Sequence, residues 1–230
     1  MKTLSSFVLL FCFAAIAFAQ ERVIDKSEFD AIVTGGYGHK LKWKDEKYRL
    51  SVTTSSKVTG RPTTDFSSKS ITEYGPRMET RTINTSTFGG KPSPGQETLR
   101  IGNWIYTRSG NDSWSRKEFV STSLPAKAAE ESPHKVLSSE AEHRYLGQST
   151  LGNKPVQMYV KTERRTTLNE KTGETTESES RNTYWVDSKG MVLKNEYKSD
   201  NRSKHTSQTY VLMEWELDPS ITFTAPEIAP

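Results

Sequence analysis

Apolar and polar side chains alternate with a period of two along most of the chain that follows the glycine-rich turn at 35–38. Tyr48, Leu50 and Val52, for example, alternate with Arg49 and Ser51. This period is typical of a β-strand that buries one face. The same pattern predicts a strand or strand pair over 40–52 and further strands over 66–74, 77–84, 97–107, 112–119, 138–149, 155–168, 178–187, 191–199 and 205–217.

Short clusters of turn-forming residues separate these strands. The clearest hairpin signals lie at 152–155, 171–173, 187–190 and 199–201. Because such short connections join antiparallel neighbours, a run of them predicts an up-and-down meander. The sequence does not alternate strands with helices in the manner of a parallel sheet. The predicted fold class is therefore mainly β with a few short helices, built on a single large curved antiparallel sheet.

Two short segments are predicted to be helical. Asp25 is a suitable N-cap, and Phe29 and Val33 fall on one face of a helix over 26–33. A second helix of two turns is predicted over 124–131. A flexible loop at 85–96 and this second helix separate the two halves of the sheet, but no linker is long enough to separate domains. We therefore expect one domain over residues 20–230.

The N-terminal segment has the features of a secretory signal. Lys2 precedes an apolar run from Phe7 to Phe18, and Ala17-Phe18-Ala19 matches a cleavage site. We expect residues 1–19 to be removed and the remaining domain to be periplasmic or secreted. No other stretch approaches the roughly 18 consecutive apolar residues that a membrane-spanning helix needs, so an integral membrane protein is not expected.

Charge and cysteine content narrow the function classes. The chain has 32 Lys and Arg against 28 Asp and Glu, with the two signs interleaved. This is not the clustered basic footprint of a nucleic-acid-binding protein. The single cysteine, Cys12, lies in the predicted signal, so the mature domain is expected to use no disulfide or thiol chemistry. Cys12 also raises the alternative of lipid attachment, although Phe11 stands before it where a small residue is needed.

Candidate catalytic and metal-binding residues are few. His39, His134, His143 and His205 have no metal-ligand spacing and no cysteine partners. The serines lack a nucleophile-elbow context, and the paired carboxylates lie in polar segments that give no reason for a raised pKa. We expect a protein that is not an enzyme and that uses no cofactor and no metal. A hydrolase acting on envelope polymers is the least favoured alternative.

Three lysines, Lys40, Lys42 and Lys44, fall on one face of a predicted strand. Charges in this arrangement are typical of an edge strand protected from aggregation. They also allow a transient contact with an anionic membrane surface, which is the alternative interpretation.

Aromatic residues are concentrated on the predicted strands. Two short helices cover little of a sheet of about ten strands, so we expect one apolar face to remain open as a groove. The candidate ligand-binding residues of this cavity are Trp104, Tyr106, Trp114, Tyr159, Trp185, Tyr210 and Trp215. The alternative is that the sheet curls or splits into a sandwich and buries its own aromatic side chains.

Three segments carry a likeness to a known family: 98–106 (TLRIGNWIY), 184–194 (YWVDSKGMVLK) and the ending 218–226 (DPSITFTAP). With the signal and the short helix, they resemble the LolA/LppX-type periplasmic lipoprotein-carrier superfamily. The resemblance covers 40–226 and implies an incomplete antiparallel barrel with a short helical lid, whose cavity carries the acyl chains of lipoproteins or other lipids. This chain departs from the family pattern in its scarce lid material and in its strands rich in Ser, Thr and charge.

The function that the sequence favours is an exported, non-catalytic carrier that binds lipid or lipoprotein acyl chains in a hydrophobic cavity. The alternative is an envelope protein-interaction or structural module that uses the same fold without a lipid. Nucleic acid is not an expected partner. The ligand, the oligomeric state and the host class remain open, and so does the inward face of the sheet, because a shift of one residue exchanges the two faces.

Overall fold

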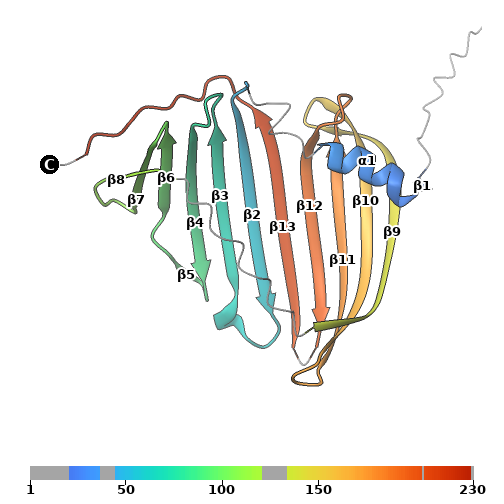
Figure 1. Ribbon diagram of the computed structural model, residues 1–230. Helices are drawn as coiled ribbons and strands as arrows, with labels where there is room; N and C mark the ends of the chain where they lie inside the picture. Colours follow the sequence, from blue (N-terminus) through green and yellow to red (C-terminus); the bar gives the residue numbers. More distant parts are fainter. Residues whose placement is uncertain (1–20, 37–44, 121–133, 204, 229–230) are drawn as a thin grey trace, which may run out of the picture.

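The computed structural model describes residues 21–36, 45–120, 134–203 and 205–228. These residues form one very wide antiparallel sheet and one α-helix (Figure 1). The helix is α1 (Lys26–Gly36), and a short 3-10 helix, η1 (Pro62–Thr64), follows the second strand. The strands are β1 (Arg22–Val23), β2 (Tyr48–Val58), β3 (Phe66–Tyr74), β4 (Thr80–Phe88), β5 (Lys91–Pro92), β6 (Gln96–Ile101), β7 (Trp104–Ser109), β8 (Ser115–Glu118), β9 (His134–Leu151), β10 (Lys154–Asn169), β11 (Thr175–Val186), β12 (Val192–Arg202) and β13 (Thr206–Leu217).

The sheet consists of two meanders that meet in its middle. The strand order is β1-β9-β10-β11-β12-β13-β2-β3-β4-β6-β7-β8, and β5 pairs with β4 beside this path. The contact between the last long strand, β13, and β2 joins the two meanders, with Trp215 opposite Leu50. The terminal strands of this order, β1 and β8, are not paired with each other, so the sheet is not closed into a barrel. The predicted single antiparallel sheet that forms an incomplete barrel is confirmed.

Most predicted hairpins are present, but the sequence pattern missed one turn and misplaced another. The predicted strand over 97–107 is two strands, β6 and β7, which are joined at Gly102, where φ is +55°. The predicted turn at 199–201 lies inside β12, where Ser199 pairs with Thr209 of β13. The chain instead reverses between Arg202 and Thr206. The loop predicted at 85–96 is also partly ordered into strand, since it contains the end of β4 and all of β5.

Helix α1 lies across one face of the sheet, over the ends of β9, β10 and β11 (Figure 1). Its predicted cap is present, because the backbone N–H of Glu28 donates to Oδ1 of Asp25 at 2.7 Å. Phe29 and Val33 of the helix are buried with strand residues in the main core cluster. Val192 of this cluster is fully buried, at 0% exposure. The helix is thus held by its apolar side chains on one part of the sheet.

Several sequence-based predictions fall outside the described residues. These are the signal at 1–19, the charged strand with Lys40, Lys42 and Lys44, and the second helix over 124–131. Within the described residues, no helix is long and apolar enough to span a membrane.

Candidate functional site

The two faces of the sheet can be assigned from the strand registers. Side chains alternate between faces along a strand, and directly paired residues of antiparallel strands share a face. Tyr159 and Tyr184 are paired and belong to the cluster under α1, so they mark the face that the helix covers. From Tyr184 the pairing leads to Asn195 and Met213, and from Met213 to Val52. We call this side the helix face and the other side the opposite face.

The helix face is almost free of charge over the middle of the sheet. On β12 it carries Asn195, Tyr197, Ser199 and Asn201, whereas the opposite face carries Lys194, Glu196, Lys198, Asp200 and Arg202. Val192 also lies in the cluster under α1, because a register shift between Trp185 and Val186 interrupts the alternation there. The same division holds on β11, β13, β2, β3 and β4, none of which places an Asp, Glu, Lys or Arg on the helix face. Six adjacent strands therefore present an uncharged surface on one side only.

Charge returns to the helix face on β10. This strand places Lys161, Glu163 and Arg165 there, because each pairs with a helix-face residue of β11. Nζ of Lys161 lies 2.7 Å from Oε2 of Glu163, so these two charges form an ion pair. The uncharged surface thus ends at β10 and spans β11 to β4.

Apolar residues gather on the part of the helix face nearest α1. Trp215 packs against both core clusters and pairs with Leu50 of β2. Tyr48 and Tyr74 stack with ring centroids 4.5 Å apart and an interplanar angle of 12°. We define the apolar zone as Tyr48, Leu50, Val52, Tyr74, Val211, Met213 and Trp215. All of these side chains except the buried Tyr48 are half-buried.

The phenols of this region add no charge at ordinary pH. Burial raises the pKa of Tyr48 to about 12, and it also raises the pKa of Tyr74 and of Tyr159 above the usual value. These hydroxyl groups therefore stay protonated and neutral, and the apolar zone carries no ionised side chain.

Hydroxyl and amide side chains occupy the other half of the same strands. We define the hydroxyl zone as Thr54, Ser56, Ser199, Asn201, Ser207 and Thr209. The pairing of Ser199 with Thr209, and of Thr209 with Ser56, makes it continuous across three strands. The hydroxyl groups of Thr72 and Thr82, 3.2 Å apart, extend the same chemistry to β3 and β4. On β13 and β2 the helix face therefore changes from apolar to hydroxyl-rich along the strand. On β3, by contrast, Thr72 pairs with Leu50 of the apolar zone.

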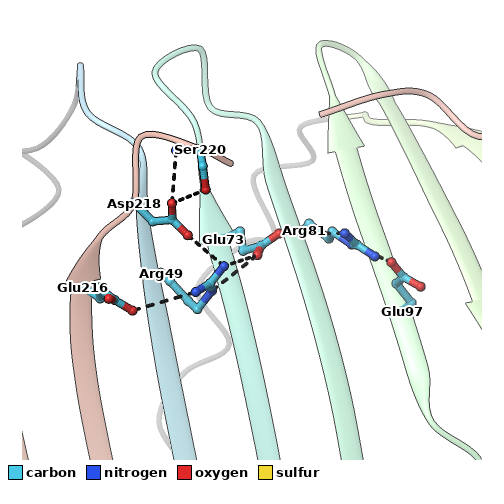
Figure 2. A network of polar contacts seen from close by, with 7 residues as sticks. All are labelled: Arg49, Glu73, Arg81, Glu97, Glu216, Asp218 and Ser220. Carbon is cyan, nitrogen blue, oxygen red and sulfur yellow. Dashed lines mark hydrogen bonds and ion pairs between the residues drawn. The ribbon is translucent and has the colours of Figure 1, made fainter. Parts of the chain in front are cut away.

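The opposite face is organised by charge (Figure 2). Arg49 lies 3.0 Å from Glu73 and 2.9 Å from Asp218, and Nε of Arg81 donates to Glu97 at 2.6 Å. Arg108 of β7 continues the row with a 2.6 Å contact to the other carboxylate oxygen of Glu97. This network links the C-terminal segment after β13 to β2, β3, β4, β6 and β7.

Glu97 is the most enclosed carboxylate of this network, at 8% exposure. Desolvation alone would raise its pKa, but the hydrogen bonds from Arg108 and Arg81 outweigh that effect and hold the pKa below its usual value. The guanidinium of Arg108 also lies 4.7 Å from the ring centroid of Trp114. Because each of these charged groups is engaged with its neighbours, the geometry is that of a structural network rather than of an acid/base pair.

The structure places the sequence-predicted ligand-binding residues on both faces. Tyr159 and Trp215 lie on the helix face and meet in the cluster under α1. Trp104, Tyr106, Trp185 and Tyr210 lie on the opposite face, and Trp114 follows β7 and stacks on Arg108 of that face. Arg116, Lys194 and Lys198 lie over Trp104, Trp185 and Tyr210 respectively. Trp185 and Trp215 nevertheless both pack against the second core cluster, which contains Tyr48 and Leu193. The seven residues therefore do not all line one face of the sheet.

Sequence reasoning missed several residues of the apolar zone. Leu50, Val52, Val211 and Met213 are aliphatic and were passed over in favour of aromatic residues. Their signal was nevertheless present, because each belongs to the alternating set of its strand that contains no Asp, Glu, Lys or Arg. The other set contains Arg49 and Lys57 on β2, and Glu214 and Glu216 on β13. A comparison of the two alternating sets for charge, strand by strand, would have identified the helix face.

The remaining chemical possibilities are limited among the described residues. In that part of the chain, no group of three or more His, Cys, Asp and Glu side chains is arranged to hold a metal ion. A hollow of about 440 Å³ on the opposite face is lined by Glu140, Arg164, Glu179, Asp200 and Arg202, among others. Its charged lining is not suited to an apolar ligand.

Similarity to known proteins is found among solved structures. No protein-family model and no curated protein matches the chain. Among solved structures, the chain is similar to a LolA superfamily protein from Nitrosomonas europaea, with 8% sequence identity and a TM-score of 0.26. The match covers 81% of this chain and 90% of that chain. It falls in the superfamily that the sequence resembles, but at this TM-score it carries no function from one protein to the other.

Proposed function

We propose that this protein is a non-catalytic lipid carrier that holds an acyl chain on the apolar zone of the helix face. The observation that carries this proposal is the uncharged, half-buried apolar strip formed by Leu50, Val52, Val211, Met213 and Trp215 on a sheet of one layer. Among the described residues, α1 is the one α-helix, and its principal strand contacts are with β9 and β11, although Trp215 of β13 also packs against the cluster that α1 joins. Exposed apolar surface of this kind is typical of a binding site.

The dimensions and energetics suit an acyl chain. Adjacent strands lie about 4.8 Å apart, so the three strands that carry the apolar zone, β13, β2 and β3, span roughly 10 Å. Burial of an acyl chain contributes about 0.8 kcal/mol for each CH₂ group removed from water. An acyl chain on the apolar zone would gain its affinity from apolar contact and would need no ionic partner.

Lipid extraction and probe titration test the proposal. Organic extraction of the purified mature protein is expected to release co-purified lipid, and a fluorescent neutral acyl glycerol is expected to bind saturably with a change in tryptophan emission. If neither lipid nor saturable binding is found, the lipid carrier is excluded and the alternative of a lipid-free protein-interaction module is favoured.

Two adjacent residues of β13 give a matched pair of variants. Met213 lies on the helix face and Leu212 on the opposite face, and both are half-buried. Met213→Gln is expected to raise the Kd of the probe at least tenfold, since about 1.4 kcal/mol of apolar contact corresponds to that factor. Leu212→Gln is expected to change the Kd less than twofold. Equal effects of the two substitutions would contradict the assignment of the apolar zone.

A further inference from the structure

We propose that the lipid carried on the helix face has a neutral, polyhydroxylated head group, as in a glycolipid, and that this head group lies on the hydroxyl zone. This inference rests on the proposed function, because the acyl chain on the apolar zone places the head group. It goes further in naming the class of lipid. It predicts discrimination against phospholipids and free fatty acids, whose head groups contain an anionic phosphate or carboxylate.

The first argument is the distribution of charge. A phosphate or carboxylate head group is normally bound by Arg or Lys, whose charged hydrogen bonds offset its desolvation. The helix face offers no cation from β11 to β4, although the opposite face of those strands carries many, including Arg49, Arg81 and Lys198. On these strands the cationic side chains therefore lie on the opposite face, and none lies on the face that holds the lipid in this proposal.

The second argument is the order of side chains along single strands. On β13 the helix face carries Ser207 and Thr209, followed by Val211, Met213 and Trp215. The hydroxyl-bearing half of β2, with Ser56 and Thr54, runs beside the hydroxyl-bearing half of β13. The face thus changes from polar to apolar in one direction, which matches an amphiphile that lies along the strands.

The third argument is the chemistry of the polar half. A hydroxyl side chain offers one donor and two acceptors, and an amide offers both donors and an acceptor. Sugar hydroxyl groups have the same dual character, so Ser199, Asn201 and Thr209 can exchange hydrogen bonds with them in either sense. A carboxylate is only an acceptor and would leave part of this zone unmatched.

Two exposed phenylalanines lie beside the hydroxyl zone. Phe66 and Phe88 are directly paired on β3 and β4, and Phe66 in turn pairs with Ser56 of the hydroxyl zone. Their exposures of 36% and 58% are high for this residue type. Flat apolar rings beside hydroxyl groups fit a sugar ring, which presents C–H groups on its faces and hydroxyl groups at its rim.

A solvated surface with no ligand is the simpler interpretation of a Ser- and Thr-rich strand face. Such a face of a wide sheet is ordinarily mixed with charges that keep it soluble and prevent edge association. The opposite face has that composition on the same six strands, with Lys69, Arg181 and Glu214 among its residues. Solvation alone therefore does not account for a face from which charge is absent.

Displacement of the fluorescent neutral acyl glycerol tests the inference directly. Three competitors with identical dioleoyl chains are compared: monogalactosyl diacylglycerol, phosphatidylglycerol and diacylglycerol. The galactolipid is expected to displace the probe at a concentration at least tenfold lower than either of the others. If phosphatidylglycerol displaces the probe as well as the galactolipid or better, the inference is wrong but the lipid-carrier proposal stands. If diacylglycerol displaces the probe as well as the galactolipid, the inference is also wrong, because the sugar then adds nothing to the affinity. No binding of the probe itself removes both proposals.

Adjacent threonines of β2 provide the matched variants. Thr54 lies in the hydroxyl zone and Thr53 lies on the opposite face, and both are half-buried. Thr54→Lys is expected to reverse the preference toward phosphatidylglycerol, whereas Thr53→Lys is expected to leave it unchanged. A preference unaffected by Thr54→Lys would place the head group elsewhere. Because the readout is a ratio between two lipids, a general loss of stability does not imitate it.

Phe88 gives a second variant at an exposed position. Phe88→Ala is expected to weaken the galactolipid several-fold and to leave diacylglycerol unchanged, since only the sugar contacts this ring. Equal weakening of both lipids would contradict the stacking role.

Discussion

At the scale of single residues, His143 is a buried titratable group whose ring contacts the helix. It is 6% exposed on β9, and its ring centroid lies 4.7 Å from that of Phe29 of α1. Desolvation is the main cause that lowers the pKa of His143, and the charges of Lys161 and Lys26 lower it further, while Asp30 and Glu163 act in the other sense. The imidazole is therefore neutral beneath the helix at pH 7.

This environment predicts a pH dependence of stability. Between pH 7 and pH 5 the unfolded chain takes up a proton at this histidine more readily than the folded chain, so the free energy of unfolding should decrease as the pH falls. His143→Phe, which keeps a ring beside Phe29, is expected to flatten this part of the curve. Chemical denaturation at pH 7, 6 and 5 measures the effect. His134→Phe, at an exposed position, is the control, and an unchanged slope in His143→Phe would contradict the assignment.

At the scale of elements, the C-terminal segment after β13 is held by a small number of contacts (Figure 2). Oδ1 of Asp218 accepts a hydrogen bond from the backbone N–H of Ser220 at 3.0 Å, and its other oxygen lies 2.9 Å from Arg49. The hydrogen bonds from Ser220, assisted by the charge of Arg49, lower the pKa of Asp218. Ile221, at 5% exposure, anchors the segment beyond this turn. Asp218 thus couples the segment to the charged network of the opposite face.

Asp218→Asn is expected to loosen this segment without unfolding the sheet. The neutral amide keeps the size of the side chain but loses the charge that Arg49 contacts. Limited proteolysis followed by mass spectrometry should show several-fold faster cleavage near Phe223. Glu216→Gln is the matched control, because Glu216 lies 3.8 Å from Arg49 and is 68% exposed. Equal cleavage rates in the two variants would mean that the Arg49 contact does not hold the segment.

At this scale, some features of the fold could be predicted from the sequence and others could not. Local signals sufficed for the antiparallel meander and for the capped helix, because Asp25 and the turn at Asp187 act on nearby backbone groups. Gly102 was passed over because the predicted strand continued through it. The pairing of β13 with β2 had no local signal, since strands far apart in sequence find each other through the whole sheet. The charge pattern separates the two alternating sets within one strand, but only the pairing shows which sets of different strands share a face.

At the scale of the whole molecule, the two faces of one sheet differ in their side-chain chemistry. Salt bridges on the opposite face link neighbouring strands from β13 to β7 and keep that surface solvated. The helix face carries no charged side chain from β11 to β4, and its apolar zone lies beside its hydroxyl zone. Among the described residues, the strands form one sheet whose terminal strands, β1 and β8, are not paired with each other.

This separation of charge predicts that binding of the neutral acyl probe is insensitive to salt. Contacts between apolar groups are not screened by ions, whereas attraction between exposed charges weakens as the Debye length falls from roughly 14 Å at 50 mM to about 4 Å at 500 mM salt. The Kd of the probe should therefore change less than twofold between 50 and 500 mM NaCl. As an internal comparison, Thr54→Lys should gain affinity for phosphatidylglycerol that declines over the same range of salt. A tenfold weakening of the neutral probe in the unmodified protein would place the bound lipid against the charged residues of the opposite face instead of the apolar zone.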